Sequence, residues 1–251
     1  MSELQEDIIL YLSSEKGKPS DISNHLSSPL VLTDSLSFEL GLIKLVYPGI
    51  FYNVIDGDIS YYSFVKKTRT VTTIPSQFYS SPQKFIDAFN KAIGEDLEYY
   101  PLTFDQATQK FQILLRTDGT QQAFLQISKN IAKLLSFPEQ LDQRLGYFES
   151  ILPWDQSAEQ ENMFLHCNLC DYVNVGNSYE QLLTVIGHGI GRTTSSGQIE
   201  YEPFNVIYQP ISNKIISEIS ISLKTEHGSS FPFIGGKTLA VVHLRPRQPN
   251  L

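Results

Sequence analysis

A strict alternation of apolar and polar residues near the C-terminus constrains the fold of this chain most. Ile219, Ile221 and Leu223 alternate with serine and lysine, so successive side chains point to opposite faces of an extended strand. One face of such a strand packs into a core while the other meets water. A second extended run, Thr238–Arg245, follows a glycine-containing loop. We predict that Ile215–Pro246 forms a β-hairpin that closes a β-rich domain.

Extended patterns of the same kind occur on both sides of a central region. Leu36–Leu42 alternates apolar with polar or small residues, which predicts a half-buried strand. Ile50–Val54 and Ile59–Val65 flank the turn signal Asp56-Gly57-Asp58, so we predict that they pair as a hairpin. Further strands are expected at Asp7–Tyr11, Gly146–Leu152, Met163–Val173, Leu182–Gly187 and Phe204–Gln209. About nine short strands suit a mainly β, antiparallel sandwich of the jelly-roll type.

The central region, residues 68–143, has helical spacing in two places. Ser81-Pro82 precedes apolar residues at helical spacing and Gly94 follows them, which predicts a short amphipathic helix. Ser128 stands where it can cap a second helix, which Phe137-Pro138 ends.

Between these helices the pattern is extended again. Phe111–Arg116 and Gln122–Ile127 flank Asp118-Gly119, a pair that favours the positive φ angles of a tight hairpin. We therefore predict a jelly roll built from residues 1–67 and 144–251, with a small α+β insertion of helix–hairpin–helix form at residues 68–143.

Charge and cysteine content exclude some classes of protein. The formal net charge of −8 argues against a chain that wraps nucleic acid, because neutralising phosphates requires an excess of Lys and Arg. Two cysteines are too few for a disulfide framework in 251 residues. The apolar run Ile8–Leu12 is far shorter than a membrane span or a signal-peptide core. We expect neither direct nucleic-acid binding, nor secretion, nor membrane insertion.

Motifs that could carry catalysis or metal binding are isolated. Cys167 and Cys170 have C-x-x-C spacing beside His166, but a structural zinc needs four ligands. Since residues three apart on a strand point to opposite faces, we expect one cysteine to pack in the core. Gly187–Gly191 lacks the spacing of a phosphate loop and is interpreted as a loop between strands. The sequence predicts no enzyme, no cofactor and no metal site; a β-sandwich hydrolase would need His166 or His188 to meet a carboxylate and a serine.

Aromatic residues are numerous, with 15 Phe and 13 Tyr. Pairs such as Phe51-Tyr52, Tyr61-Tyr62 and Tyr99-Tyr100 could form a platform for carbohydrate or nucleic acid. Side chains of this kind more often fill sandwich cores and subunit interfaces, where a tyrosine buries its ring and keeps its hydroxyl in water. We favour the core or interface interpretation.

Four groups of short segments follow one another along the chain. They are Phe38–Leu42 with Lys44–Pro48 and Tyr52–Val54; Leu125–Ser128 with Ile131–Phe137; Cys170–Val173 with Val175-Gly176 and Leu182-Leu183; and Ile219–Ile221 with Gly228, Phe233, Gly236 and Val242–Arg245. In this order they resemble the capsid-related proteins of Polinton (Maverick) elements and their adintovirus-like and virophage-like relatives. The departures, Phe38 for Trp, Ser136 for Gly and Leu244 for Phe, keep apolar or small character.

This resemblance implies a penton, or minor capsid, protein: a single jelly roll that forms homopentamers at icosahedral vertices beside a major capsid protein with a double jelly roll. It also implies a place in the virion after synthesis in the host cytoplasm or nucleus. Structural or interface roles are expected for Tyr47, Pro48, Tyr52, Gly228, Phe233, Gly236, His243 and Arg245. The alternative function is a jelly-roll recognition module that binds a glycan or a host protein through aromatic-rich loops.

Overall fold

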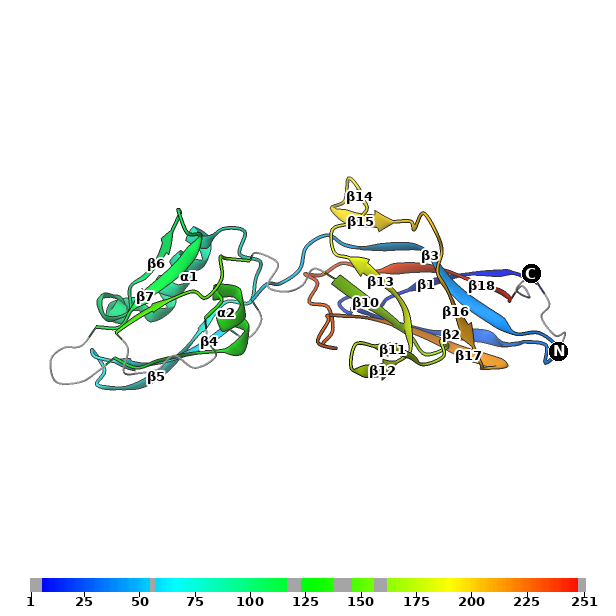
Figure 1. Ribbon diagram of the computed structural model, residues 1–251, viewed down its shortest axis with the longest axis horizontal. Helices are drawn as coiled ribbons and strands as arrows, with labels where there is room; N and C mark the ends of the chain where they lie inside the picture. Colours follow the sequence, from blue (N-terminus) through cyan, green and yellow to red (C-terminus); the bar gives the residue numbers. More distant parts are fainter. Residues whose placement is uncertain (1–5, 55–56, 117–122, 138–145, 156–161, 248–251) are drawn as a thin grey trace. The chain divides into compact units, whose positions relative to one another are not determined.

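The computed structural model describes residues 6–54, 57–116, 123–137, 146–155 and 162–247 (Figure 1). The chain forms two compact units. The first unit combines Met1–Phe51 with Gln160–Leu251, and the second is Tyr52–Glu159.

The first unit contains two antiparallel sheets that face each other (Figure 1). One sheet has the order β1 (Ile8–Ser13), β18 (Leu239–Pro246), β3 (Phe38–Pro48), β15 (Gln198–Tyr201) and β14 (Arg192–Thr193), and β16 (Tyr208–Ile211) also pairs with β3. The other sheet has the order β13 (Leu182–Gly187), β10 (Asn162–Cys167), β17 (Ile215–Lys224) and β2 (Asp21–Val31). A two-stranded ribbon, β11 (Val173–Val175) and β12 (Ser178–Glu180), lies between β10 and β13 in the chain.

The strand pairing is nested. The first strand pairs with the last, β2 pairs with β17, β3 pairs with β15 and β16, and β10 pairs with β13. Each pair is antiparallel, and the chain crosses between the two sheets at every connection except β10 to β13, β14 to β15 and β15 to β16. Folding one long hairpin over on itself in this way produces a jelly roll. The predicted mainly β, antiparallel jelly roll is confirmed.

The predicted hairpin at Ile215–Pro246 is wrong, although both of its strands exist. β17 and β18 lie in opposite sheets and do not pair with each other. Ile219, Ile221 and Leu223 are buried, as are the alternate residues of β18, so the two strands pack their apolar faces into one core from opposite sides. The loop between them has positive φ at Gly228, Gly235 and Gly236 and crosses from one sheet to the other.

The predicted pairing of Ile50–Val54 with Ile59–Val65 is also wrong. In the second unit, β4 (Gly57–Ser63) pairs with β5 (Thr68–Ile74) on one side and with β8 (Leu125–Ile127) on the other. Gly57 and Asp58 are part of strand β4, and Asp56 lies outside the described residues. The segment Thr68–Ile74 provides a longer partner strand than Ile50–Val54, in which Phe51 instead bridges to Phe233 of the first unit.

The helices of the second unit pack on its short sheets. They are α1 (Pro82–Ile93), the 3-10 helix η1 (Gly94–Tyr99) and α2 (Lys129–Leu135). Helix α1 packs against β5 and β6, and α2 packs against β4. The predicted helix α1 is confirmed, and so are the residues expected to begin and end it. Ser81 Oγ accepts a hydrogen bond from the Lys84 amide at 3.4 Å, and Gly94 ends the helix with a φ of 65°.

The predicted hairpin of Phe111–Arg116 with Gln122–Ile127 is wrong as well. β7 (Lys110–Leu114) pairs with β6 (Leu102–Asp105) and β9 (Tyr147–Glu149), whereas β8 pairs with β4. Asp118-Gly119 lies outside the described residues. The strand expected at Gly146–Leu152 is thus β9 of the second unit and not part of the jelly roll.

Helix α2 begins after Ser128, as predicted, but the side chain of Ser128 makes no capping hydrogen bond. Its hydroxyl is buried without a hydrogen-bond partner among the described residues.

Candidate functional site

The expected interface residues Tyr47 and Phe233 lie in the interior of the first unit. Tyr47 is fully buried, and its hydroxyl donates a hydrogen bond to the Ile190 carbonyl at 3.2 Å. Burial raises the pKa of Tyr47 to about 12. The ring of Phe233 lies 6.0 Å from that of Tyr47, and both belong to an aromatic cluster around His188. These two side chains build the core.

His188 has an unusual place in this aromatic cluster. Its ring stacks on Phe231 at 5.2 Å and meets the edge of Phe51 at 4.4 Å. Its Nε2 is buried and has no hydrogen-bond partner among the described residues. Burial therefore lowers the pKa of His188, because a charged imidazolium would lose hydration without gaining a partner.

The candidate glycines shape loops. Gly236 has a φ of 82°, and a Cβ there would lie 2.9 Å from Cγ of Pro48, so this site requires glycine both for its backbone and for its contact with Pro48. Gly228 also has a positive φ, but no atom lies within 4 Å of an added Cβ there, and the residue lines a surface hollow. Tyr52 begins the second unit and is half-buried.

His243 and Arg245 are partly buried on the outer face of β18, where both contact Tyr208 of β16. The Tyr208 hydroxyl lies 2.8 Å from Nδ1 of His243, and the Arg245 guanidinium stands 3.6 Å above the tyrosine ring. Arg245 also donates hydrogen bonds of 2.8 Å to Glu39, and Nε2 of His243 lies 3.3 Å from Asp7. A continuous polar network therefore connects β3, β16 and β18 with Asp7, the residue before β1.

Tyr208, which lies at the centre of this network, was not predicted as a site residue. The signal available was Gly41, which breaks the row of larger side chains on β3. A Cβ at Gly41 would lie 2.5 Å from Val206 and 2.9 Å from the Tyr208 ring. The absent side chain at Gly41 lets Tyr208 lie flat across the sheet, where Arg245 can stack on it.

Exposed apolar side chains occur at both edges of the sheet that contains β1 and β3. On edge strand β1, Ile9 and Tyr11 point to solvent; we call these the β1 patch. At the opposite edge, the loop between β15 and β16 carries Phe204, which is 100% exposed, and Ile207; we call these the loop patch. Isolated apolar residues are common on surfaces, whereas apolar side chains exposed together can mark a contact site.

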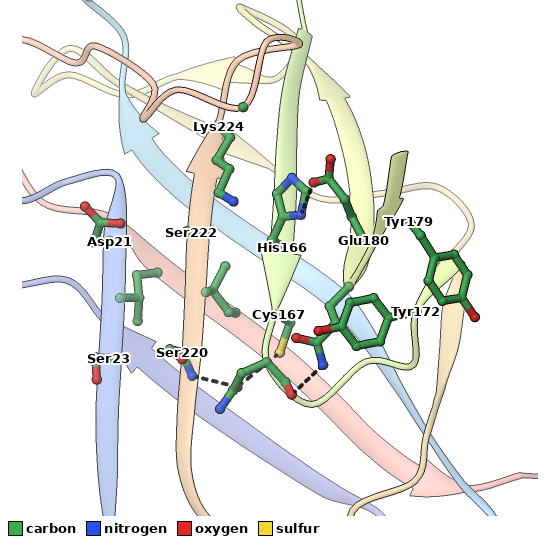
Figure 2. A pocket seen from close by; sticks show the side chains of 15 residues that line it. Asp21, Ser23, His166, Cys167, Tyr172, Tyr179, Glu180, Ser220, Ser222 and Lys224 are labelled. Carbon is green, nitrogen blue, oxygen red and sulfur yellow. Dashed lines mark hydrogen bonds and ion pairs between the residues drawn. The ribbon is translucent and has the colours of Figure 1, made fainter. Parts of the chain in front are cut away.

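The outer face of the other sheet carries a hollow with a volume of about 640 Å³ (Figure 2). Serines of β2 and β17 lie on its floor beside Asp21, and His166 of β10 and Glu180 of β12 lie beside them. Nδ1 of His166 is 3.2 Å from the Glu180 carboxylate. Tyr172 and Tyr179 stack on each other at the rim, with ring centroids 5.3 Å apart.

The electrostatics of this hollow favour a neutral histidine. Burial and the charge of Lys224 lower the pKa of His166, and Glu180 opposes them without reversing the direction. The Glu180 carboxyl has a lowered pKa, mainly because Ser178 donates a hydrogen bond to it at 2.6 Å. Both pKa shifts therefore favour a neutral His166 beside an ionised Glu180.

Both cysteines are buried, whereas only one was expected to be. Cys170 follows the turn at Asn168-Leu169 after β10 and forms a bridge to Ile211, so the alternation of one continuous strand does not apply to it. Both thiols are free. A hydrogen bond between them, together with burial, raises the pKa of Cys170. Within the described residues, no group of three His, Cys, Asp or Glu side chains is placed to hold a metal ion.

The first unit is thus a single jelly roll with apolar patches at two edges of one sheet and a polar hollow on the other. The chain matches no family model and no curated protein. Among solved structures it is similar to the crystal structure of the selenomethionine-labelled mavirus penton protein, with 10% sequence identity, coverage of 97% of this chain and 100% of that chain, and a TM-score of 0.46. The jelly-roll assignment rests on the strand pairing. None of the described helices is long and apolar enough to cross a membrane.

Proposed function

We propose that this protein is a structural protein of a virion: a penton, or minor capsid, subunit that forms homopentamers at the vertices of an icosahedral capsid of the Polinton (Maverick), adintovirus or virophage kind. The observation that carries the proposal is the presence of apolar patches at opposite edges of one jelly-roll sheet. The ordered resemblance of four groups of sequence segments to penton proteins supports it. A major capsid protein with a double jelly roll is the expected neighbour.

The positions of the two patches suit a ring. In a ring with cyclic symmetry each subunit contacts its neighbours head to tail, so it needs two different and complementary surfaces. The β1 patch and the loop patch are such a pair, because they lie at opposite edges of the same sheet. A contact between them would cover aromatic side chains of the kind that interfaces favour, here Tyr11 and Phe204.

The β1 edge gives a second reason for a contact there. Strand β1 pairs with β18 on one side only, so its other side presents backbone N–H and C=O groups. Such an edge attracts another chain unless it is covered. The loop patch of a neighbouring subunit would cover it and would remove Ile9 and Tyr11 from water.

Two glutamate variants test this arrangement. Tyr11→Glu disables the β1 patch, and Phe204→Glu disables the loop patch, because each puts a carboxylate into an apolar contact. Each variant alone is expected to lose the ring. An equimolar mixture should form a dimer of one copy of each variant, since one intact patch remains on each partner. The control, Val71→Glu, changes an exposed residue of the second unit and should keep the ring.

Native mass spectrometry reads out these assemblies directly. Rings that persist in both Tyr11→Glu and Phe204→Glu would contradict the proposed contact. If Phe204→Glu assembled normally while Tyr11→Glu did not, the contact would be between two β1 edges about a twofold axis, and the ring would be excluded.

A recognition module for a glycan or a host protein is the second candidate function. The polar hollow with its stacked tyrosines favours it (Figure 2). The two functions are compatible, because the hollow and the two apolar patches lie on different sheets.

A further inference from the structure

Two adjoining hollows lie on the outer face of the sheet formed by β13, β10, β17 and β2. The first has a volume of about 640 Å³ and the second about 380 Å³. Both are lined by His166, Glu180 and Gly228, so the His166–Glu180 pair stands between them. Small-molecule sites commonly enclose about 300–1,000 Å³. Together the hollows form a groove with two adjacent subsites.

Short hydroxyl side chains make the floor of the first hollow. Strand register places Asp21 beside Ser222, and Ser222 beside His166, in one row across three strands. Ser220 lies two residues back on the same face of β17. Ser220 and Ser222 are partly exposed and line the hollow, so their hydroxyls can donate to and accept from a ligand.

The rim of the first hollow provides aromatic surface. Tyr172 and Tyr179 are 53% and 65% exposed, and their rings stack with an angle of 22° between the planes. Stacking holds each ring in place, and it leaves the outer ring surface and the hydroxyl free. Figure 2 shows both tyrosines on the side of the hollow where Glu180 lies, opposite Asp21. A ligand with both C–H and O–H faces would meet the rings and the polar floor at once.

The charges of the groove exclude an acidic ligand. The lining carries the carboxylates of Asp21, Glu180 and Glu226 but the single cation of Lys224. His166 adds no positive charge at neutral pH, because burial lowers its pKa. The excess of carboxylates would repel sialylated or sulfated molecules, and it offers acceptors to uncharged hydroxyl groups.

We infer that this groove binds a neutral saccharide of at least two hexose units, with one sugar against Tyr172 and Tyr179 and the next beyond the His166–Glu180 pair. Each feature has its counterpart in such a ligand. Sugar C–H faces pack on the tyrosine rings, and sugar hydroxyls bond with Ser220, Ser222 and Asp21.

Binding is tested with the full chain against a printed array of neutral, sialylated and sulfated glycans. Saturation-transfer difference NMR with the neutral disaccharides that give a signal then measures affinity. Tyr179→Ala should weaken binding about tenfold, which corresponds to the loss of one aromatic contact. Tyr179→Phe should bind like the wild type, because the ring remains. Ser222→Leu fills the floor and should abolish binding.

The matched control is Tyr147→Ala, which removes a half-exposed tyrosine from the second unit and should leave affinity unchanged. All variants are compared by circular dichroism, so that a folding defect is separated from lost binding. The inference is overturned if no neutral glycan binds, if only acidic glycans bind, or if Tyr179→Ala and Ser222→Leu bind as tightly as the wild type. Assembly into rings is measured separately, so either result stands without the other.

Discussion

Replacing Gly41 by alanine should destabilise the first unit measurably. The added Cβ would lie 2.5 Å from Val206 and 2.9 Å from the Tyr208 ring, both too close for a carbon contact. Tyr208 would have to lift from the sheet, which would disturb its contacts with His243 at 2.8 Å and Arg245 at 3.6 Å. Forcing an extra methyl into a packed site costs about 1–3 kcal/mol. In a unit of this size we expect the melting temperature to fall by about 3–10 °C.

Gly146→Ala is the matched control for this substitution. A Cβ at Gly146 would meet only the Leu115 carbonyl oxygen, at 3.5 Å, which is an ordinary contact. The control should be neutral or slightly stabilising, because alanine restricts the unfolded chain. Thermal unfolding followed by near-ultraviolet circular dichroism, with hydrogen exchange of the peptides that cover β3 and β16, separates the first unit from the second. A Gly41→Ala protein as stable as the wild type, with unchanged exchange in β16, would refute the packing of Tyr208 over Gly41.

Three further predictions follow from burial and capping. Leu244→Ala removes a fully buried side chain from β18 and should lower the free energy of unfolding by about 2–5 kcal/mol in urea denaturation; a loss below 1 kcal/mol would contradict its place in the core. The pKa of His188 is lowered in the folded state, so the unfolded chain binds an extra proton and the free energy of unfolding should fall as the pH drops below about 6.5. His188→Phe should reduce this pH dependence of the melting temperature between pH 5 and 7.5. An unchanged pH dependence would contradict the burial of a neutral His188. Ser81→Ala should destabilise α1 by about 0.5–2 kcal/mol. Ser128→Ala should leave the stability of α2 unchanged, because the Ser128 hydroxyl makes no hydrogen bond among the described residues. Equal changes in the hydrogen exchange of α1 and α2 would contradict this difference in capping.

Local signals in the sequence predict individual elements well. The alternation of Ile219, Ile221 and Leu223 marks strand β17, because period-2 burial depends only on neighbouring residues. Ser81-Pro82 and Gly94 mark the two ends of α1 for the same reason. Fold class follows from such elements, since many short strands with one apolar face can be buried only in a sandwich or barrel.

Strand partners could not be predicted by the same signals. Each of the three expected hairpins joined strands that are close in sequence, whereas β1 pairs with β18 across nearly the whole chain. Alternation shows which face of β17 is buried but does not show which strand lies beside it. The nested pairing depends on how the strands of both sheets share one core, and this is a property of the whole unit.

The candidate site was predicted only in part. His243 and Arg245 were expected on an outer or interface surface, and they lie partly buried on the outer face of β18. Tyr208 was missed because its role depends on Gly41 of a strand that is distant in sequence. The hollow with Tyr172 and Tyr179 was missed because the ribbon of β11 and β12 brings the two rings together.

The mass of the purified protein under native conditions tests the central claim most directly. The proposal predicts a particle with five times the 28.4 kDa mass of one chain, and a five-fold ring in electron micrographs, either alone or after mixing with the major capsid protein. A protein that stays at 28.4 kDa at all concentrations, and that also fails to join particles of the major capsid protein, would contradict it.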